Sequence, residues 1–286
     1  MTFSEKFLSK DWFCANSDLN TSEWVLAGIP YDGTCSYRPG TRFASEQIRL
    51  CSKELEDFSS IQYKTLEDVS FFDAGDLDLP TGNRDEVLDT IYSAVKETLG
   101  MGKKWFGIGG EHLVTYPEIL AYIEKYPDLA VIHFDAHSDL RDDYLGQKLS
   151  HATVMKRIAD KIGPKNIPQI GIRSCPKDEW DWMIENKTLL LTQDDIKKTA
   201  EKFKNQPVFI TIDVDVLDPS IMPGTGTPEA GGLTYKELIS TLLMFKDLNV
   251  VGADVVEVSP PFDTTGLSVT TAAKLIRELL IMIGKK

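Results

Sequence analysis

Short apolar segments alternate along the chain with longer segments whose apolar residues recur at helical spacing. Most of the short segments are apolar without alternation, which is typical of strands buried on both faces of a parallel sheet. The pattern predicts eight strands, at residues 24–29, 69–73, 104–108, 129–134, 167–172, 188–191, 207–212 and 250–256. It predicts eight helices, at residues 44–56, 84–100, 115–125, 151–162, 177–186, 193–204, 234–246 and 268–283.

The alternation of strands and helices indicates an α/β fold with parallel strands and right-handed crossovers. The pattern allows either a closed barrel or an open sheet, and both place functional residues beyond the C-terminal ends of the strands. Thr234 and Glu237 form a capping-box pattern that opens one helix. Because no repeat, low-complexity tract or linker is evident, residues 1–286 are expected to form a single domain.

The composition indicates an acidic globular protein. Hydrophobic residues make up 42% of the chain, and the formal charge of −13 disfavours binding to nucleic acid or anionic lipid. The cysteines Cys14, Cys35, Cys51 and Cys175 form no CxxC pair, so reduced thiols are the simplest account of them. The segment that starts at Met1 has no signal-peptide pattern, and no stretch approaches the ~18 apolar residues of a membrane span. A cytoplasmic protein is therefore expected.

The most distinctive polar segment follows the predicted strand at 129–134 and contains Asp135, His137 and Asp139. In an extended chain these three side chains would point to the same side. A single carboxylate at such a place usually caps the next helix, but three alternating potential ligands indicate a metal site. His133 lies inside the strand and is interpreted as a supporting or core residue, not as a ligand.

Two further segments also follow predicted strands. Asp213 and Asp215 come directly after a buried strand and would share a face, whereas Asp218 precedes a proline and is expected to serve a turn. His112 follows the strand at 104–108 after two glycines. Alone it would be an ordinary loop residue, but beside the other segments it completes a set of six ligands.

This ligand set predicts two metal ions. Imidazoles and carboxylates form a mostly hard ligand set. Such a set suits manganese better than the thiolate-rich ligand set of many zinc sites does. Six ligands are too many for one transition metal with an open position, but they fit two metals ~3.5–4 Å apart that share carboxylates and a water. Four Asp carboxylates balance two divalent ions, and a bridging hydroxide would leave one negative charge. Such a centre would favour a monocationic group in the substrate.

The three segments, in this order, resemble the signature motifs of the ureohydrolase family, which includes arginases and agmatinases. The resemblance extends over nearly the whole chain and is strongest toward bacterial agmatinases. The matching segments are Ser36–Gly40, Gly109–His112, Asp135–Asp139, Asp213–Pro219, Pro223–Pro228, Gly231–Thr234 and Glu257–Asp263. Glu111 stands where aspartate is commoner in the family, at a position that is not a metal ligand there.

The resemblance implies a three-layer α-β-α fold around an open, mostly parallel eight-stranded sheet, with two Mn²⁺ ions per subunit. Asp135 and Asp213 would bridge both metals, and Asp139 would also accept a hydrogen bond from the bridging hydroxide. The remaining ligands would be His112 and Asp139 for one metal, and His137 and Asp215 for the other. A homotrimer or homohexamer is also implied.

The implied activity is hydrolysis of agmatine to putrescine and urea, in polyamine biosynthesis. A guanidinium has a pKa above ~12 and is a poor electrophile, so water needs the strong activation that a dinuclear centre supplies. Glu257 would orient the guanidinium through paired hydrogen bonds, and His151 would transfer a proton to the departing amine.

Other functions remain open. The loop at 140–150 lacks the Asn- and Ser-containing pattern of arginases, and Asp142 or Asp143 could bind the second cation of agmatine. Arg141 could instead pair with a carboxylate and favour guanidinobutyrate; arginine and formiminoglutamate are further candidate substrates. A metal-free relative acting as a binding protein and the single-zinc deacetylase branch of the fold are less favoured, because the full ligand set is present.

Overall fold

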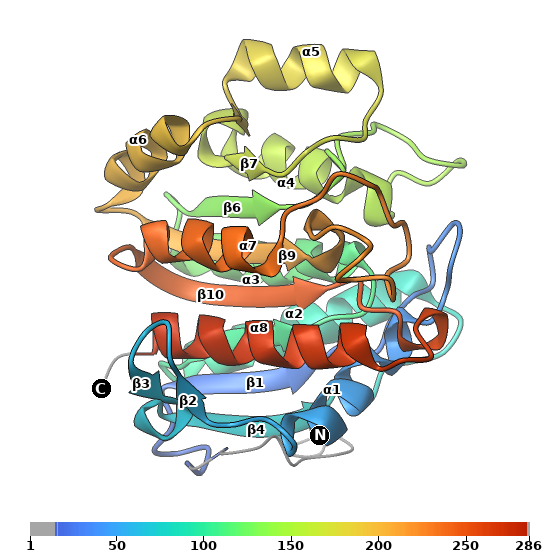
Figure 1. Ribbon diagram of the computed structural model, residues 1–286. Helices are drawn as coiled ribbons and strands as arrows, with labels where there is room; N and C mark the ends of the chain where they lie inside the picture. The colour runs from blue at the N-terminus through green and yellow to red at the C-terminus, as the bar shows by residue number, and fades with distance from the viewer. Residues whose placement is uncertain (1–14, 16, 285–286) are drawn as a thin grey trace.

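The computed structural model describes residue 15 and residues 17–284. Within these residues, eight strands form one sheet in the order β4-β1-β5-β10-β9-β6-β7-β8, and every neighbouring pair is parallel (Figure 1). The strands are β1 Trp24–Gly28, β4 Phe71–Asp76, β5 Lys104–Ile108, β6 Ala130–Phe134, β7 Gln169–Ile170, β8 Leu189–Leu190, β9 Pro207–Asp213 and β10 Asn249–Val256. The predicted strands are confirmed, and the sheet is open, with β4 and β8 at its edges.

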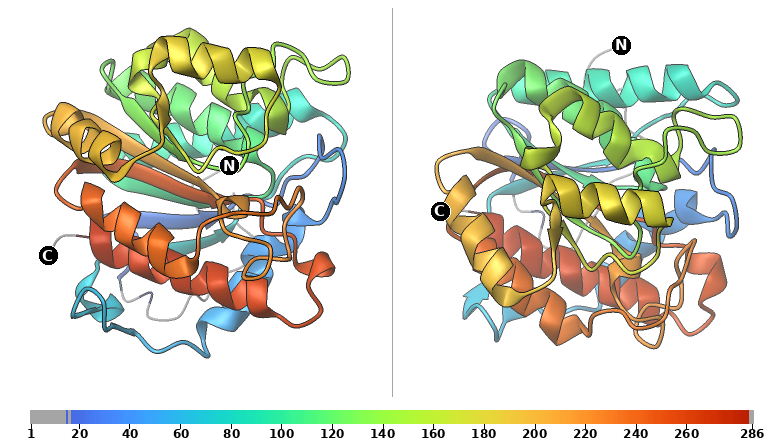
Figure 2. Two further views of the ribbon diagram at one scale, coloured as in Figure 1. Left: turned by 45° about the horizontal axis from the view of Figure 1, so that its top comes forward. Right: turned by 90° about the horizontal axis from the view of Figure 1, so that it is seen from above.

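Helices cover both faces of the sheet and complete the three-layer α-β-α fold (Figure 2). One hydrophobic core joins the sheet to α2, α3, α4 and α5, and the other joins it to α1, α6, α7 and α8. The helices are α1 Ala44–Ser52, α2 Arg84–Gly100, α3 Thr115–Lys125, α4 Val154–Ile162, α5 Lys177–Asn186, α6 Gln193–Phe203, α7 Tyr235–Leu242 and α8 Leu267–Ile283. The predicted helices are therefore confirmed, with shifts at some ends.

Capping and turn geometry explain where several helices begin and end. The Thr234 hydroxyl accepts a hydrogen bond from the backbone N–H of Glu237, whose carboxylate accepts one from the backbone N–H of Thr234, so the predicted capping box is confirmed. The helix predicted from residue 151 opens with a 3₁₀ turn at His151–Thr153 before α4 begins. The helix predicted to end at residue 246 likewise changes to a 3₁₀ turn at Leu243–Phe245.

A short antiparallel hairpin was not predicted. It consists of β2 Phe58–Ser59 and β3 Lys64–Thr65, which are too short to leave a hydrophobic pattern in the sequence. The Ser59 hydroxyl donates a hydrogen bond to the carboxylate of Glu278 in α8, which ties the hairpin to the second core.

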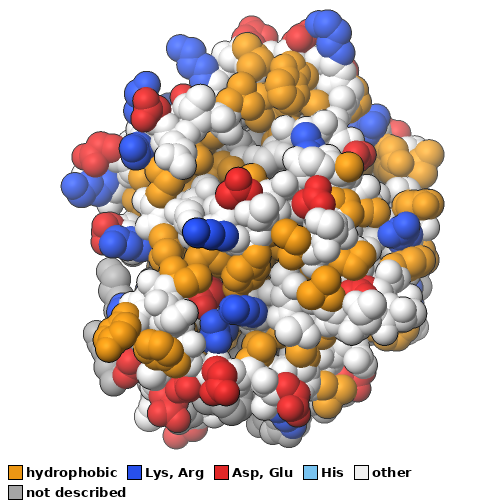
Figure 3. All heavy atoms as spheres, in the orientation of Figure 1, with side chains coloured by type: hydrophobic (Ala, Val, Ile, Leu, Met, Phe, Trp, Pro, Cys, Tyr) orange, Lys and Arg blue, Asp and Glu red, His pale blue; other side chains and the backbone are white. Residues whose placement is uncertain are grey.

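Other sequence expectations can be compared with the described residues. Cys35, Cys51 and Cys175 are free thiols, whereas Cys14 and the segment that starts at Met1 lie outside the described residues. Among residue 15 and residues 17–284, no helix is both long and apolar enough to cross a bilayer. On the face drawn in Figure 3, acidic and basic side chains are interspersed.

The order of the strands determines where the polar segments meet. The four strands β5, β10, β9 and β6 are consecutive neighbours at the centre of the sheet, and all of them are parallel. The carboxyl ends of these strands therefore all lie at the same end of the sheet, which is where open α/β sheets bind their ligands. His112, Glu257 and the Asp135 segment each follow one of these strands, and Asp213 is the last residue of β9.

Candidate metal centre and active site

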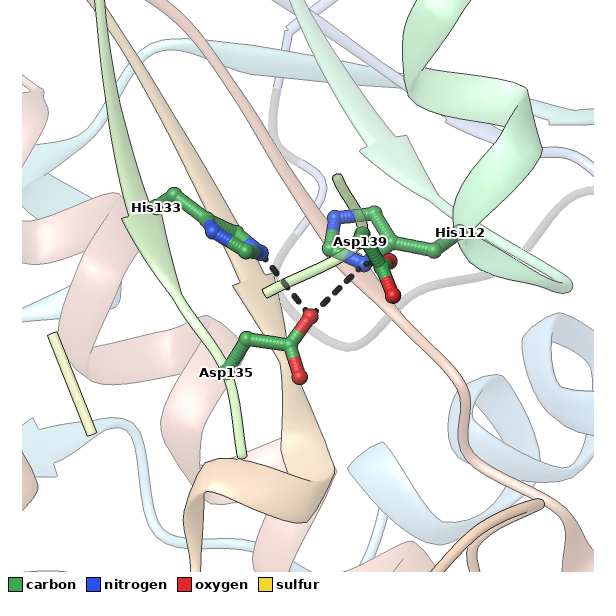
Figure 4. A group of neighbouring side chains, drawn as sticks. All are labelled: His112, His133, Asp135 and Asp139. Carbon is green, nitrogen blue, oxygen red and sulfur yellow. Dashed lines mark hydrogen bonds and ion pairs between the residues drawn. The ribbon is translucent and has the colours of Figure 1, made fainter. Parts of the chain in front are cut away.

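His112 lies at the centre of a buried group of carboxylates. Its Nδ1 atom is 3.1 Å from Asp135 Oδ2, 3.2 Å from Asp139 Oδ2 and 3.6 Å from Asp213 Oδ2. Figure 4 shows the imidazole of His112 directed toward Asp135 and Asp139. Its other nitrogen, Nε2, is 3.0 Å from the hydroxyl of Thr211. This contact orients the ring so that Nδ1 faces the carboxylates.

Asp135, His137 and Asp215 form a second group that adjoins the first. The Nδ1 atom of His137 is 2.9 Å from Asp215 Oδ2 and 3.4 Å from Asp135 Oδ1. One potential ligand atom from each of the three residues lies within 4.8 Å of the others. Asp135 belongs to both groups, so the arrangement can hold two neighbouring cations that share a carboxylate.

Backbone groups orient the acids from behind. The backbone N–H of Ala136 donates to Asp215 Oδ1 at 2.9 Å, and that of Asp215 donates to Asp213 Oδ1 at 2.8 Å. In each carboxylate the second oxygen remains available to the cluster. Hydrogen-bonding partners of this kind hold metal ligands in a fixed orientation.

The acids do not converge in the way the sequence analysis expected. The sequence analysis assumed an extended chain, in which every second side chain points to the same side. Asp139 instead has φ 52°, a left-handed conformation that aspartate tolerates better than most residues. Asp215 lies in a 3₁₀ turn at Val214–Val216 that Asp213 caps. Both segments leave the sheet and turn at once, so the turns, not the strand period, bring these ligands together.

The protonation equilibria show that the cluster favours positive charge. Burial lowers the pKa of His112, but the facing carboxylates of Asp135, Asp139 and Asp213 outweigh it and raise this pKa well above its ordinary value. Burial and the neighbouring Asp215 and Asp135 carboxylates raise the pKa of Asp213 well above its ordinary range.

One buried atom also supports a fit to cations. Within the described part of the chain, Nδ1 of His112 is buried and has no partner in hydrogen-bonding geometry, although three carboxylates face it. Buried polar nitrogens seldom remain unsatisfied. A cation between the imidazole and the carboxylates would satisfy them all, so these residues fit a hard or borderline divalent metal.

His133 contacts the cluster but in a supporting geometry. Its Nδ1 atom lies 3.1 Å from Nε2 of Gln169, which also donates to the carbonyl of Ser138. Because the amide nitrogen is only a donor, Nδ1 of His133 accepts and Nε2 carries the proton. That Nε2–H points to Asp135 Oδ2 at 2.8 Å (Figure 4). These contacts favour the supporting role over a ligand role.

A cavity of about 470 Å³ opens onto this cluster, and His137, Asp139, Asp213, His151 and Glu257 are among its lining residues. Glu257 is buried, and its Oε1 atom accepts a hydrogen bond from the backbone N–H of His112 at 2.7 Å. Burial and the nearby Glu111 raise the pKa of Glu257 well above its ordinary value. A cationic group in the cavity would counteract that rise.

Several residues around the cavity were not singled out by the sequence analysis. The hydroxyls of Thr34 and Ser36 lie 3.4 Å and 3.3 Å from the two ring nitrogens of His151. Ser138 and Glu179 line the cavity and are hydrogen-bonded to each other. Ser36 lies in a segment that the family resemblance covers. An isolated serine or threonine, however, forms no motif with its neighbours that would mark it as part of a site.

The sequence analysis considered Arg141, Asp142 and Asp143 for substrate binding, and the structure places these residues in different surroundings. Arg141 lines the cavity, and its guanidinium lies 5.1 Å from the centre of the Tyr144 ring. Asp142 instead pairs with Arg157 at 3.0 Å outside this cavity. Asp143 accepts a hydrogen bond from the backbone N–H of Gly146. Neither of these two acids is among the residues lining the cavity, whereas Glu179 is.

Comparisons with known proteins agree with the geometry. The model of the arginase family matches residues 22–282. An agmatinase from Bacillus anthracis is 45% identical over 286 residues, covering 98% of this chain and 99% of that relative. The crystal structure of a Clostridium difficile protein, provisionally named an agmatinase, has 43% sequence identity and a TM-score of 0.90. The match covers 93% of this chain and 99% of that chain. A proclavaminate amidino hydrolase from Streptomyces clavuligerus has 32% identity and a TM-score of 0.85, covering 97% and 98%. The chain therefore belongs to the arginase family.

Proposed function

We propose that this protein is an agmatinase that hydrolyses agmatine to putrescine and urea with two Mn²⁺ ions. The observation that carries the proposal is that the six potential metal ligands, His151 and Glu257 surround one cavity or lie directly beneath it. The similarity to an agmatinase of Bacillus anthracis at 45% identity supports the choice of substrate. From the family resemblance we also propose one domain, a cytoplasmic homotrimer or homohexamer, and a role in polyamine biosynthesis.

The proposed ligands divide as the two clusters do. His112 and Asp139 would serve one ion and His137 and Asp215 the other, with Asp135, which belongs to both groups, shared. From the family resemblance Asp213, which faces His112, would be shared as well. Two divalent ions at such a site activate a water molecule near neutral pH. Asp139, which lines the cavity, would accept a hydrogen bond from the attacking water.

Glu257 and His151 would act on the substrate itself. Oε1 of Glu257 already accepts the His112 N–H, so Oε2 and the remaining lone pair of Oε1 are the groups that can receive guanidinium N–H donors. Burial lowers the pKa of His151, so its protonated form readily gives up its proton. His151 would transfer that proton to the departing amine.

The substrate proposal predicts a clear order of activities. Agmatine should give the highest kcat/KM when urea release is measured beside arginine, guanidinobutyrate and guanidinopropionate, and when formamide release is measured with formiminoglutamate. Discrimination of about tenfold or more is expected, because a charged tail that leaves buried partners unsatisfied costs on the order of 1–3 kcal/mol.

A second substrate is favoured by one observation. Arg141 lines the cavity and could pair with a carboxylate, which would place guanidinobutyrate first. In that case the metal-dependent reaction stands and the agmatinase proposal fails. If the protein with manganese bound released no urea from any of the guanidino compounds and no formamide from formiminoglutamate, the hydrolase proposal would be contradicted as well.

Manganese should stabilise the folded protein. Each ion that binds only the native state adds about 2.7 kcal/mol when its concentration is 100 times Kd. For a chain of this size the midpoint of thermal unfolding should rise by at least about 5 °C for each ion. Calorimetry with excess Mn²⁺, followed by a chelator, measures the rise and its reversal. An unchanged midpoint, with no manganese retained after gel filtration, would contradict the proposed ligands.

A further inference from the structure

The hydroxyl of Thr34 lies between a buried carboxylate and the ring of His151. Its Oγ1 atom is 2.5 Å from Glu111 Oε1, and the backbone N–H of Thr34 donates to Glu111 Oε2 at 2.7 Å. The same Oγ1 atom accepts a hydrogen bond from the backbone N–H of His151 at 3.1 Å and lies 3.4 Å from its Nδ1. Glu111 is fully buried, so this arrangement is held from inside the protein.

The hydrogen-bonding capacity of these groups determines where the protons lie. A carboxylate only accepts, so the single hydrogen of the Thr34 hydroxyl points to Glu111. Oγ1 of Thr34 can then only accept from His151, and Nδ1 of His151 must carry a hydrogen. Nε2 is left as the basic nitrogen of the neutral ring. It lies 3.3 Å from the hydroxyl of Ser36, which like His151 lines the cavity.

We propose that Thr34 is a positioning residue that fixes the tautomer and orientation of His151, so that Nε2 is the nitrogen that exchanges a proton with the substrate. This inference rests on the proposed role of His151. A second contact supports the fixed orientation, because the ring of Tyr144 meets the His151 ring edge-on with centroids 5.6 Å apart. Thr34 and Tyr144 together therefore restrain the His151 ring.

The test compares Thr34→Val with Thr34→Ser under the same conditions, since Thr34 donates to Glu111 through both its backbone N–H and its hydroxyl. Valine keeps the shape and the backbone N–H bond to Glu111 but removes the hydroxyl. We expect kcat for urea release to fall about 10- to 100-fold, since small losses of orientation are costly, while KM and bound manganese stay within about twofold. Serine restores the hydroxyl and should keep kcat within about threefold of wild type.

A double-mutant cycle separates this role from a structural one. If Thr34 acts through His151, then Thr34→Val should have no further effect in a His151→Ala background. Thr90→Val, which removes a hydroxyl bonded to the carbonyl of Glu86 on α2, is the matched control and should leave kcat unchanged.

Three results would overturn the inference: wild-type kcat in Thr34→Val, a serine variant as slow as the valine variant, or a full additional loss in the His151→Ala background. Normal turnover in Thr34→Val beside an inactive His151→Ala would refute this inference alone. Normal turnover in His151→Ala would refute the proposed mechanism and the inference together.

Discussion

Asp213→Ala should lose both bound manganese and urea release. Asp213 faces His112 at 3.6 Å, and its Oδ1 atom anchors the backbone of Asp215. Removing this carboxylate takes away a proposed ligand of both ions and loosens a second one. We expect fewer than two Mn²⁺ per chain by metal analysis and a fall in kcat/KM of at least about 1,000-fold, because the metals supply the activated water.

The control for Asp213→Ala is Asp218→Ala. Asp218 follows the same strand, but its carboxylate accepts hydrogen bonds from Ser220 and from the backbone of Gly231 and Gly232. This variant should retain a full complement of manganese. If Asp213→Ala kept its metal while Asp218→Ala lost it, the proposed division between ligand and turn residue would be wrong.

His151→Ala should separate turnover from metal binding. The His151 side chain lines the cavity and is bonded to the hydroxyls of Thr34 and Ser36, outside the two metal-binding groups. We expect kcat to fall about 100- to 10,000-fold, the usual contribution of general acid–base catalysis. Bound manganese should remain at two ions per chain, and the manganese-induced rise in the thermal midpoint should persist.

The informative comparison is between these two variants. Asp213→Ala is expected to fail at both metal binding and turnover, and His151→Ala at turnover alone. Loss of manganese from His151→Ala would show that the loop supports the cluster. Such a result would argue against a role in proton transfer.

Much of the fold could be predicted from the sequence because the strands are buried on both faces. In β6 and β9 every residue is buried and most are apolar, so the two strands are easy to recognise. The pattern could not distinguish an open sheet from a barrel, because that choice depends on pairing between distant strands. The β2–β3 hairpin was missed because strands of two residues are too short to show a pattern of apolar and polar residues.

For the site, the sequence could predict the types of residue and their positions at the ends of strands. His112 and the acids after β6 and β9 come together because their strands are neighbours or near neighbours in the sheet. The local geometry could not be predicted, since Asp139 has a positive φ and Asp215 lies in a 3₁₀ turn. Thr34 was missed because it reaches His151 from a loop 117 residues away.

The position of β10 has a consequence for how the protein is made. Without β10, the sheet consists of two separate halves, β4-β1-β5 and β9-β6-β7-β8, and only the first leads to His112. β10 joins them, yet it begins at Asn249 and is the last strand of the sheet in sequence order. A chain emerging from the ribosome therefore displays the acids of the second half before His112 can be held against them. We therefore expect that a chain that stops before β10 cannot hold His112 against these acids, so the proposed metal site would form only after β10 has joined the sheet.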